Sequence, residues 1–142
     1  MPRRQSPGWA ATGSGIVRAL AEPSMAPSAL TRVINGEIPA AIVRQDAHTI
    51  AFMDAGQINP GHAIVVTNKQ VETIVDLDEA LAGAVFRTAW RIAKAVDRAF
   101  QPDGITILQA DERAGWQTVH HVRLHVLPRH AGDGVGLAGR AS

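Results

Sequence analysis

The sequence of 142 residues contains no cysteine. This absence excludes disulfides, thiolate chemistry and zinc sites built on cysteine, and it fits a reducing compartment. We therefore expect a cytoplasmic protein. No apolar run approaches the roughly 20 residues that are needed to span a bilayer. The formal net charge is only +1, which is too small to attract nucleic acid or an anionic membrane, so we expect neither as a partner.

The residue types that are present suit a globular protein. Apolar residues make up 46% of the chain and charged residues 19%, and the length suits one domain with a sizeable core. Residues 1–26 differ, because they are rich in proline, glycine, serine and alanine and hold one acid, Glu22. We expect a disordered tail over 1–26 and one folded domain over 27–142. A transit peptide is the alternative for the tail, because its arginines outnumber its acid.

The pattern of apolar residues predicts two helices. Residues 28–34 suit a short helical turn that an Asn-Gly pair caps. A long amphipathic helix is expected to begin with Asp76 as N-cap and Glu79 in the first turn. Its apolar positions continue at helical spacing as far as Phe100.

Five segments are strand candidates, because they alternate apolar and polar residues or form short apolar runs. They cover residues 41–44, 48–54, 62–67, 105–109 and 117–127. Strands outnumber helices and follow one another along the chain, which favours an α+β fold with an antiparallel sheet.

Four of the six histidines lie in one stretch, 119-VHHVRLHVLPRH-130. On a strand, alternate side chains share a face and lie about 7 Å apart. One face should pack on the core and would carry Thr118, His120, Val122, Leu124 and Val126. The other face is a polar row that could converge on one small polar or anionic ligand, although the wet face of an antiparallel sheet is polar by default. This row consists of Gln117, Val119, His121, Arg123, His125 and Leu127.

A metal site has less support than an anion site. His121 and His125 have the i, i+4 spacing of a helical HExxH motif, but the glutamate that this motif requires after the first histidine is Val122 here. No cysteine and no neighbouring acid completes a set of ligands. We expect no metal and no cofactor.

Several segments together resemble a known family. They are RVINGEIPA (32–40), IAFMD (50–54), PGHAIVV (60–66), the long helix, and QTVHHVRLHVLPR (117–129). In this combination they resemble the histidine triad (HIT) family of nucleotide hydrolases and transferases. The resemblance implies a five-stranded antiparallel sheet with one long and one short helix, a homodimer, and a purine nucleotide or nucleotide ester as ligand.

The resemblance also implies a chemistry for the polar row. In the family, the middle histidine of His-x-His-x-His attacks the α-phosphorus of a nucleoside phosphoramidate or dinucleoside polyphosphate, and a nucleotidyl-histidine forms. The flanking positions here are His121 and His125, and the middle position is Arg123. A guanidinium stays protonated and has no lone pair to offer. We therefore expect nucleotide binding with weak or absent hydrolysis, in which Arg123 holds the phosphate.

Other positions match the family's site or depart from it. Asp54 matches an acid that binds ribose, His62 a histidine close to the site, and Gln117 and Thr118 positions that contact phosphate. Some members bind zinc through residues of the first helix and a histidine before the long helix, but the corresponding residues here are not cysteine or histidine. They are Ser28, Thr31 and Gln70. We also expect the family's C-terminal helix to be missing.

Two further functions stay open. The protein could be an active nucleotide hydrolase in which His121 or His125 is the general base for direct attack by water. It could also be a structural or interaction module in which Trp116 plugs the pocket. Nucleotide binding separates the module from the other two functions, and turnover separates the hydrolase from the binding protein.

Overall fold

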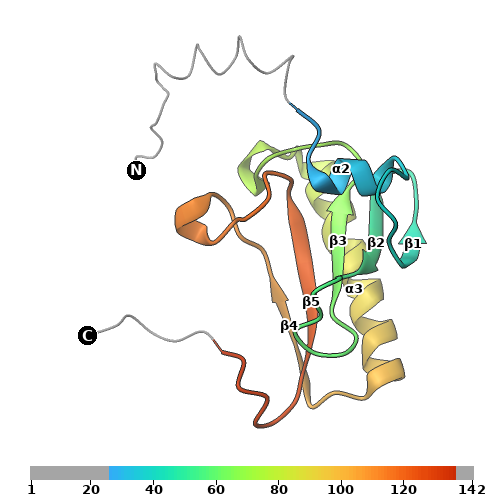
Figure 1. Ribbon diagram of the computed structural model, residues 1–142, viewed down its shortest axis with the longest axis vertical. Helices are drawn as coiled ribbons and strands as arrows, with labels where there is room; N and C mark the ends of the chain where they lie inside the picture. Colours follow the sequence, from blue (N-terminus) through green and yellow to red (C-terminus); the bar gives the residue numbers. More distant parts are fainter. Residues whose placement is uncertain (1–25, 137–142) are drawn as a thin grey trace.

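Five antiparallel strands form one sheet in the computed structural model, which describes residues 26–136 (Figure 1). The order across the sheet is β1-β2-β3-β5-β4. The predicted α+β fold is confirmed, whereas the predicted tail lies almost wholly outside the described residues. The strands are β1 (Ile42–Gln45), β2 (Thr49–Met53), β3 (Ala63–Thr67), β4 (Gly104–Leu108) and β5 (Arg123–Arg129).

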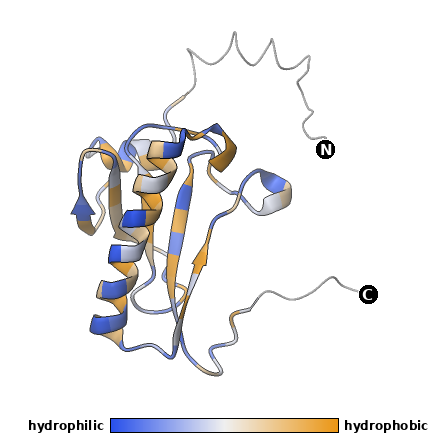
Figure 2. Ribbon diagram, turned by 180° about the vertical axis from the view of Figure 1, so that it is seen from behind, coloured by the Kyte–Doolittle hydropathy of each residue, from blue (hydrophilic) through white to orange (hydrophobic). Residues whose placement is uncertain are grey.

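The long helix α3 (Glu79–Phe100) packs on one face of the sheet. Its apolar positions meet β3 and β5 in the main core, and Figure 2 shows the alternation of polar and apolar residues along β5. The N-cap is Asp78, whose side chain accepts from the Leu81 N–H at 2.8 Å. The prediction of Asp76 was wrong, because Asp76 instead accepts from the Thr73 hydroxyl at 2.8 Å. No helix among residues 26–136 is long and apolar enough to cross a membrane.

The opposite face of the sheet is covered in part by the short helix α2 (Ala29–Ile34), which Ser28 caps at its start and Asn35, of the predicted Asn-Gly pair, at its end. A second core forms here from α2, β2 and β3, and it contains Leu30, Val33, Ile50, Phe52, Ile64 and Val66. Both faces of the sheet are therefore apolar near its centre. The polar side chains of β5 must reach solvent through the part of this face that α2 leaves uncovered.

The last strand is shorter than predicted at its start. β5 begins at Arg123, and the chain before it turns, with the His121 N–H donating to the Val119 carbonyl at 2.8 Å. The predicted strand over 117–127 is therefore wrong for its first six residues. His120 is exposed and does not lie on the buried face. β5 also runs through Pro128 to Arg129, beyond its predicted end.

Candidate functional site

Two residues of the polar row, Arg123 and His125, lie side by side on β5. They pair with Val66 and Ile64 of β3, so they share the face of the sheet that α2 partly covers. Both side chains are half-buried. The strand alternates as predicted from Arg123 onward, because the intervening Leu124 is buried in the main core on the other face.

The loop between β2 and β3 brings two more predicted residues to His125. Nε2 of His62 lies 2.9 Å from Nδ1 of His125 and 3.3 Å from a carboxylate oxygen of Asp54. His62 is 1% exposed, and Asp54 is half-buried. Asp54, His62 and His125 therefore form one connected group, which we call the relay.

A backbone hydrogen bond determines where the protons of the relay lie. The N–H of Ile58 donates to Nδ1 of His62 at 3.2 Å, so this nitrogen carries a lone pair. The proton of neutral His62 is then on Nε2, and it faces Nδ1 of His125. Nδ1 of His125 must accept, so the proton of neutral His125 is on Nε2. The free nitrogen of His125 is thus a hydrogen-bond donor.

Both histidines of the relay are held in the neutral form. Burial, followed by the positive charge of Arg123, lowers the pKa of His125 to about 4. Burial also lowers the pKa of His62, against an opposing effect of Asp54. Neither ring is charged near neutral pH.

The relay has the dimensions of a metal site, since its three ligand atoms lie within 4.8 Å of one another. A histidine that binds metal usually donates its other ring N–H to a carboxylate or carbonyl. Nδ1 of His62 instead accepts from the Ile58 N–H, so a metal on Nε2 would require a ring without any proton. The three side chains of the relay are therefore better arranged to bond to one another than to bind a metal ion.

His121 lies apart from the relay and is fully buried. Its Nε2 lies 2.8 Å from the Thr67 carbonyl, and its Nδ1 lies 2.8 Å from the Ser28 hydroxyl. Both nitrogens are engaged, so His121 offers no free lone pair to a water molecule. The Thr31 hydroxyl, which donates to the Gln70 side chain at 2.5 Å, completes a cluster that holds α2 to the sheet.

Arg123 uses only some of its N–H donors within the protein. One terminal nitrogen donates to the Thr118 hydroxyl at 2.9 Å and the other to the Val119 carbonyl at 3.2 Å. A guanidinium has five N–H donors, so others stay available for an anion. Burial lowers the pKa of Arg123, against an opposing effect of Asp54, but a guanidinium does not lose its proton in proteins.

Gln117 holds the loop before β5. Its side-chain oxygen accepts from the Glu112 N–H at 2.7 Å, and its amide donates to the Glu72 carbonyl at 2.6 Å. Both ends of the side chain are thus engaged, and Gln117 is 7% exposed. This geometry gives Gln117 a role in loop structure, while the Thr118 hydroxyl lies against the Arg123 guanidinium.

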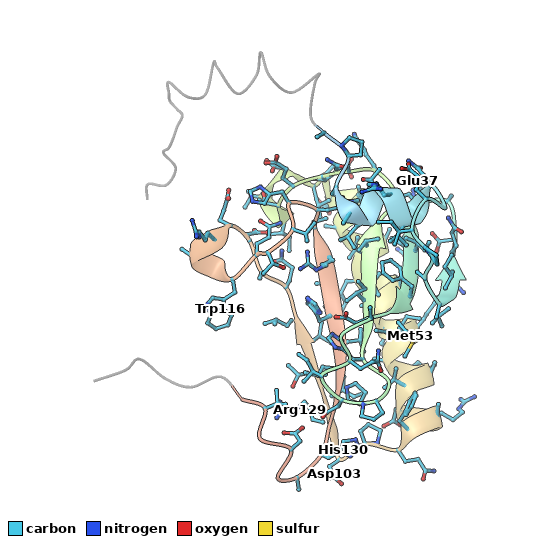
Figure 3. The ribbon with its side chains drawn as sticks, in the orientation of Figure 1. Glu37, Met53, Asp103, Trp116, Arg129 and His130 are labelled. Atoms are coloured by element: carbon cyan, nitrogen blue, oxygen red, sulfur yellow. The ribbon has the colours of Figure 1, made fainter. Side chains whose placement is uncertain are left out.

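Trp116 does not fill the site. The residue is 60% exposed, and in Figure 3 its side chain lies to one side of the sheet. It follows the short turn η3 (Arg113–Gly115) with a left-handed φ of 79°. No described contact of Trp116 therefore supports the alternative in which this side chain plugs the pocket.

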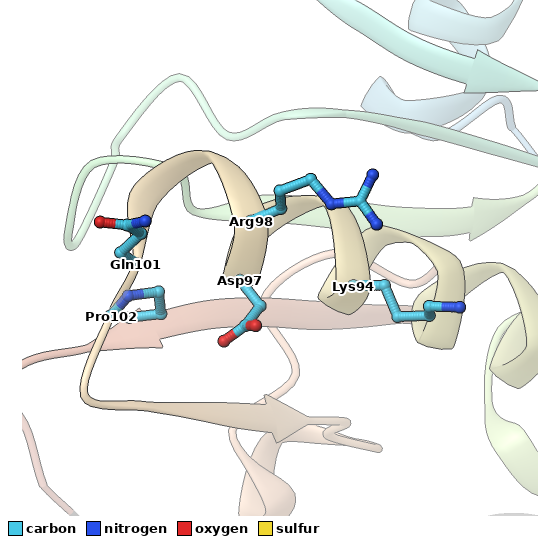
Figure 4. A pocket seen from close by; sticks show the side chains of 5 residues that line it. All are labelled: Lys94, Asp97, Arg98, Gln101 and Pro102. Carbon is cyan, nitrogen blue, oxygen red and sulfur yellow. The ribbon is translucent and has the colours of Figure 1, made fainter.

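A separate pocket of about 510 Å³ lies at the C-terminal end of α3 (Figure 4). It contains none of the predicted site residues. Four of its five residues are exposed and only Pro102 is half-buried, so it is an open depression. Its walls are Lys94, Asp97, Arg98, Gln101 and Pro102.

The protein-family model of the HIT domain matches residues 35–132. This match covers most of the chain. The protein belongs to the HIT family. The resemblance that was drawn from the sequence motifs is confirmed at the level of the family.

Individual HIT proteins agree with this assignment. The chain is 34% identical to the protein hit of Bacillus subtilis over 106 residues, which cover 74% of this chain and 73% of that protein. It is 29% identical to the adenosine 5'-monophosphoramidase hnt1 of Schizosaccharomyces pombe over 109 residues, 74% of this chain and 78% of that protein. A solved HIT family protein of Bacillus anthracis superimposes with a TM-score of 0.76 at 30% identity, covering 80% of this chain and 81% of that one.

Sequence reasoning missed the residues that organise the relay. Ile58 acts through its backbone N–H, and this role cannot be predicted from the type of the residue. Asn59 stands in an Asn-Pro-Gly sequence that is typical of a turn, and its type does not indicate that its side chain bonds to two other segments. Arg129 is likewise bonded to Asp133 by two nitrogens.

The neutral relay of this HIT protein predicts a pH dependence of stability. The pKa of His125 falls from 6.5 to about 4 on folding, so the unfolded chain takes up the proton first as the pH falls. The free energy of unfolding should therefore decrease from about pH 6.5 to about pH 4. His125→Gln should flatten this dependence in urea denaturation at a series of pH values.

A residual slope is expected in this variant, because burial also lowers the pKa values of His62 and His121. NMR titration of His125 in the unaltered protein gives an independent check. A midpoint near 6.5, or an unchanged slope in His125→Gln, would contradict the prediction.

Proposed function

We propose that this HIT protein binds a purine nucleotide or nucleotide ester and hydrolyses it weakly or not at all. One observation carries the proposal. The two polar side chains that stand next to each other on β5 are both donors, the guanidinium of Arg123 and the Nε2–H of His125. Such a pair suits an anionic phosphate. It supplies no lone pair for attack on phosphorus.

The ligand class rests on the family and on one relative. The Schizosaccharomyces pombe relative is named an adenosine 5'-monophosphoramidase, which points to nucleoside phosphoramidates, with dinucleoside polyphosphates as the other expected esters. In our proposal Asp54 accepts from the ribose hydroxyls. Its side chain is 26% exposed, and its other contacts are the Gly56 N–H and His62. An accessible carboxylate edge supports this role.

Loss of the family's nucleophile is the second part of the proposal. By its place in the motif, Arg123 stands where the family has its middle histidine. In a serine protease, removal of the nucleophile lowers kcat by roughly 10⁶. A comparable loss would leave a protein that holds its ligand without turning it over.

Direct hydrolysis by water is the second candidate function, and the geometry supports it less well. His121 has both nitrogens engaged with Thr67 and Ser28. His125 would need a lone pair on Nε2, but the relay places a proton there. A general base must accept the proton of water, so neither histidine is set up for this step. The third function, an interaction module, would need Trp116 to close the pocket, but Trp116 is exposed.

We also propose that the protein is a homodimer. The outer face of α3 exposes Phe86 at 56% and Trp90 at 52%. The strand β4 lies at the edge of the sheet and exposes Leu108 at 41%. Exposed apolar surface together with an unpaired sheet edge is typical of an association surface.

Removal of the Arg123 charge should weaken nucleotide binding. Arg123→Gln should raise the Kd for AMP roughly 10- to 100-fold, because a hydrogen bond to a charged group is worth about 1.5–3 kcal/mol. Calorimetric titration of the full chain measures the change. Arg98→Gln removes an exposed charge near the end of α3 and should leave the Kd unchanged. Equal affinity of all three proteins would contradict a phosphate contact by Arg123.

Restoration of a histidine at position 123 should create turnover. The unaltered protein should release AMP from adenosine phosphoramidate very slowly, and Arg123→His should be faster by at least roughly a hundredfold, a fraction of the effect of a nucleophile. Mass spectrometry should detect a covalent nucleotidyl adduct in the variant only. Fast release by the unaltered protein would show that another group does the chemistry.

A charge on the α3 face should break the dimer. The unaltered chain of 15.1 kDa should appear at twice this mass in size-exclusion chromatography with light scattering, and Trp90→Glu at the mass of one chain. Trp116→Glu makes the same exchange on another surface and should remain a dimer. A monomeric unaltered protein would exclude the proposed interface.

A further inference from the structure

A charge pair joins the end of β5 to the chain that follows it. The Arg129 guanidinium donates through Nε and Nη2 to the two carboxylate oxygens of Asp133, at 2.8 and 2.9 Å. The Asp133 side chain is 8% exposed. It also accepts from the N–H groups of His130 and Val135 at 3.0 Å. This bonding holds the turn after β5 in one conformation, and Figure 3 places Arg129 and His130 at that end of the sheet.

The same carboxylate reaches the loop of the relay. The side-chain amide of Asn59 donates to Asp133 at 2.9 Å and to the Pro128 carbonyl at 2.8 Å. Asn59 belongs to the loop between β2 and β3, some 70 residues earlier in the chain. One amide thus fastens the relay loop to both β5 and the turn that follows it.

Bonds inside the loop transmit this attachment. The Gln57 amide donates to the carbonyls of Asp54 and His62 at 2.7 and 2.6 Å, and the His62 N–H donates to the Asn59 carbonyl at 3.1 Å. Ile58 lies between the two tethered residues, so the direction of its N–H is fixed from both sides. At 3.2 Å, this N–H bond is at the long end of the usual range. It selects one tautomer of His62 because the backbone that carries it cannot turn away.

We propose that Asn59 is a positioning residue for the anion site. Held by Asp133, it keeps the Ile58 N–H against Nδ1 of His62 and thereby keeps the proton of His125 on Nε2. The inference deepens the proposed function, but only its consequence for binding rests on that function. With the proton on the other nitrogen, His125 would present a lone pair to a phosphate oxygen, and the two would repel each other.

The test is Asn59→Ala in the full chain, with long-range ¹H–¹⁵N NMR spectra that distinguish the two neutral tautomers of a histidine. The unaltered protein should show His125 with its proton on Nε2 alone. The variant should show both tautomers and faster hydrogen exchange at the Ile58 amide. Its Kd for AMP should rise roughly three- to tenfold, which is the effect of one neutral hydrogen bond.

Asp103→Asn is the matched control. Asp103 accepts from the Ala131 N–H at 2.8 Å, so it stabilises the same turn without contact to Asn59. This variant should keep the single tautomer of His125. If it also shows both tautomers, general loosening of the turn explains the effect and the proposal is wrong. If Asn59→Ala does not fold, Asp133→Asn, which keeps the shape of the side chain, tests the positioning role instead. This variant should also show both tautomers of His125.

The outcomes separate this inference from the proposed function. A single tautomer of His125 in Asn59→Ala, or in Asp133→Asn where that variant decides, overturns the positioning role whatever the nucleotide affinity. If the tautomer responds as expected but AMP does not bind even to the unaltered protein, the positioning role stands and the proposed function fails.

Discussion

The hydrogen bond from the Ile58 N–H to His62 determines what the site can do. It is a single backbone contact, yet it decides which nitrogen of His62 carries a proton and, through it, which nitrogen of His125 does. The character of the site thus follows from the backbone of a loop as much as from its side chains. Near neutral pH Nε2 of His125 can donate to an anion and cannot attack one.

The apolar packing of the sheet makes this arrangement possible. Because α3 covers one face and α2 part of the other, the polar side chains of β5 lie at the border of a second core. Burial there keeps the histidines neutral and lowers their pKa values. Arg123 stands at the same border and keeps its charge, so it is the positively charged member of an otherwise neutral row.

Most of the fold could be predicted from the sequence, and the reasons lie in periodicity. The long helix and the strands each have a pattern that depends on near neighbours, so α3 and four of the strands were found within a few residues of their ends. β5 was extended too far because Val119 and Val122 favour a strand by residue type, whereas bonds to distant segments, such as that of Gln117 to Glu72, turn the chain. The N-cap of α3 was misplaced by two residues, since Asp76 and Asp78 are equally good caps by type.

The sequence predicted which side chains form the site, but not the contacts that orient them. Asp54, His62 and His125 do come together, but the pattern could not show that His121 is enclosed by α2 or that Arg129 bonds to Asp133. These features depend on contacts between residues far apart in the chain. The choice of tautomer depends on a backbone direction, which no residue type encodes.

The short helix α2 is attached to the sheet by hydrogen bonds between polar side chains. Ser28, Thr31, Gln70 and His121 join the helix to the core through oxygen and nitrogen atoms alone. Such an attachment forms as the chain folds, without loading of an ion. None of the four side chains contains sulfur, so the bonds that hold this corner of the domain together offer no thiol that could be oxidised.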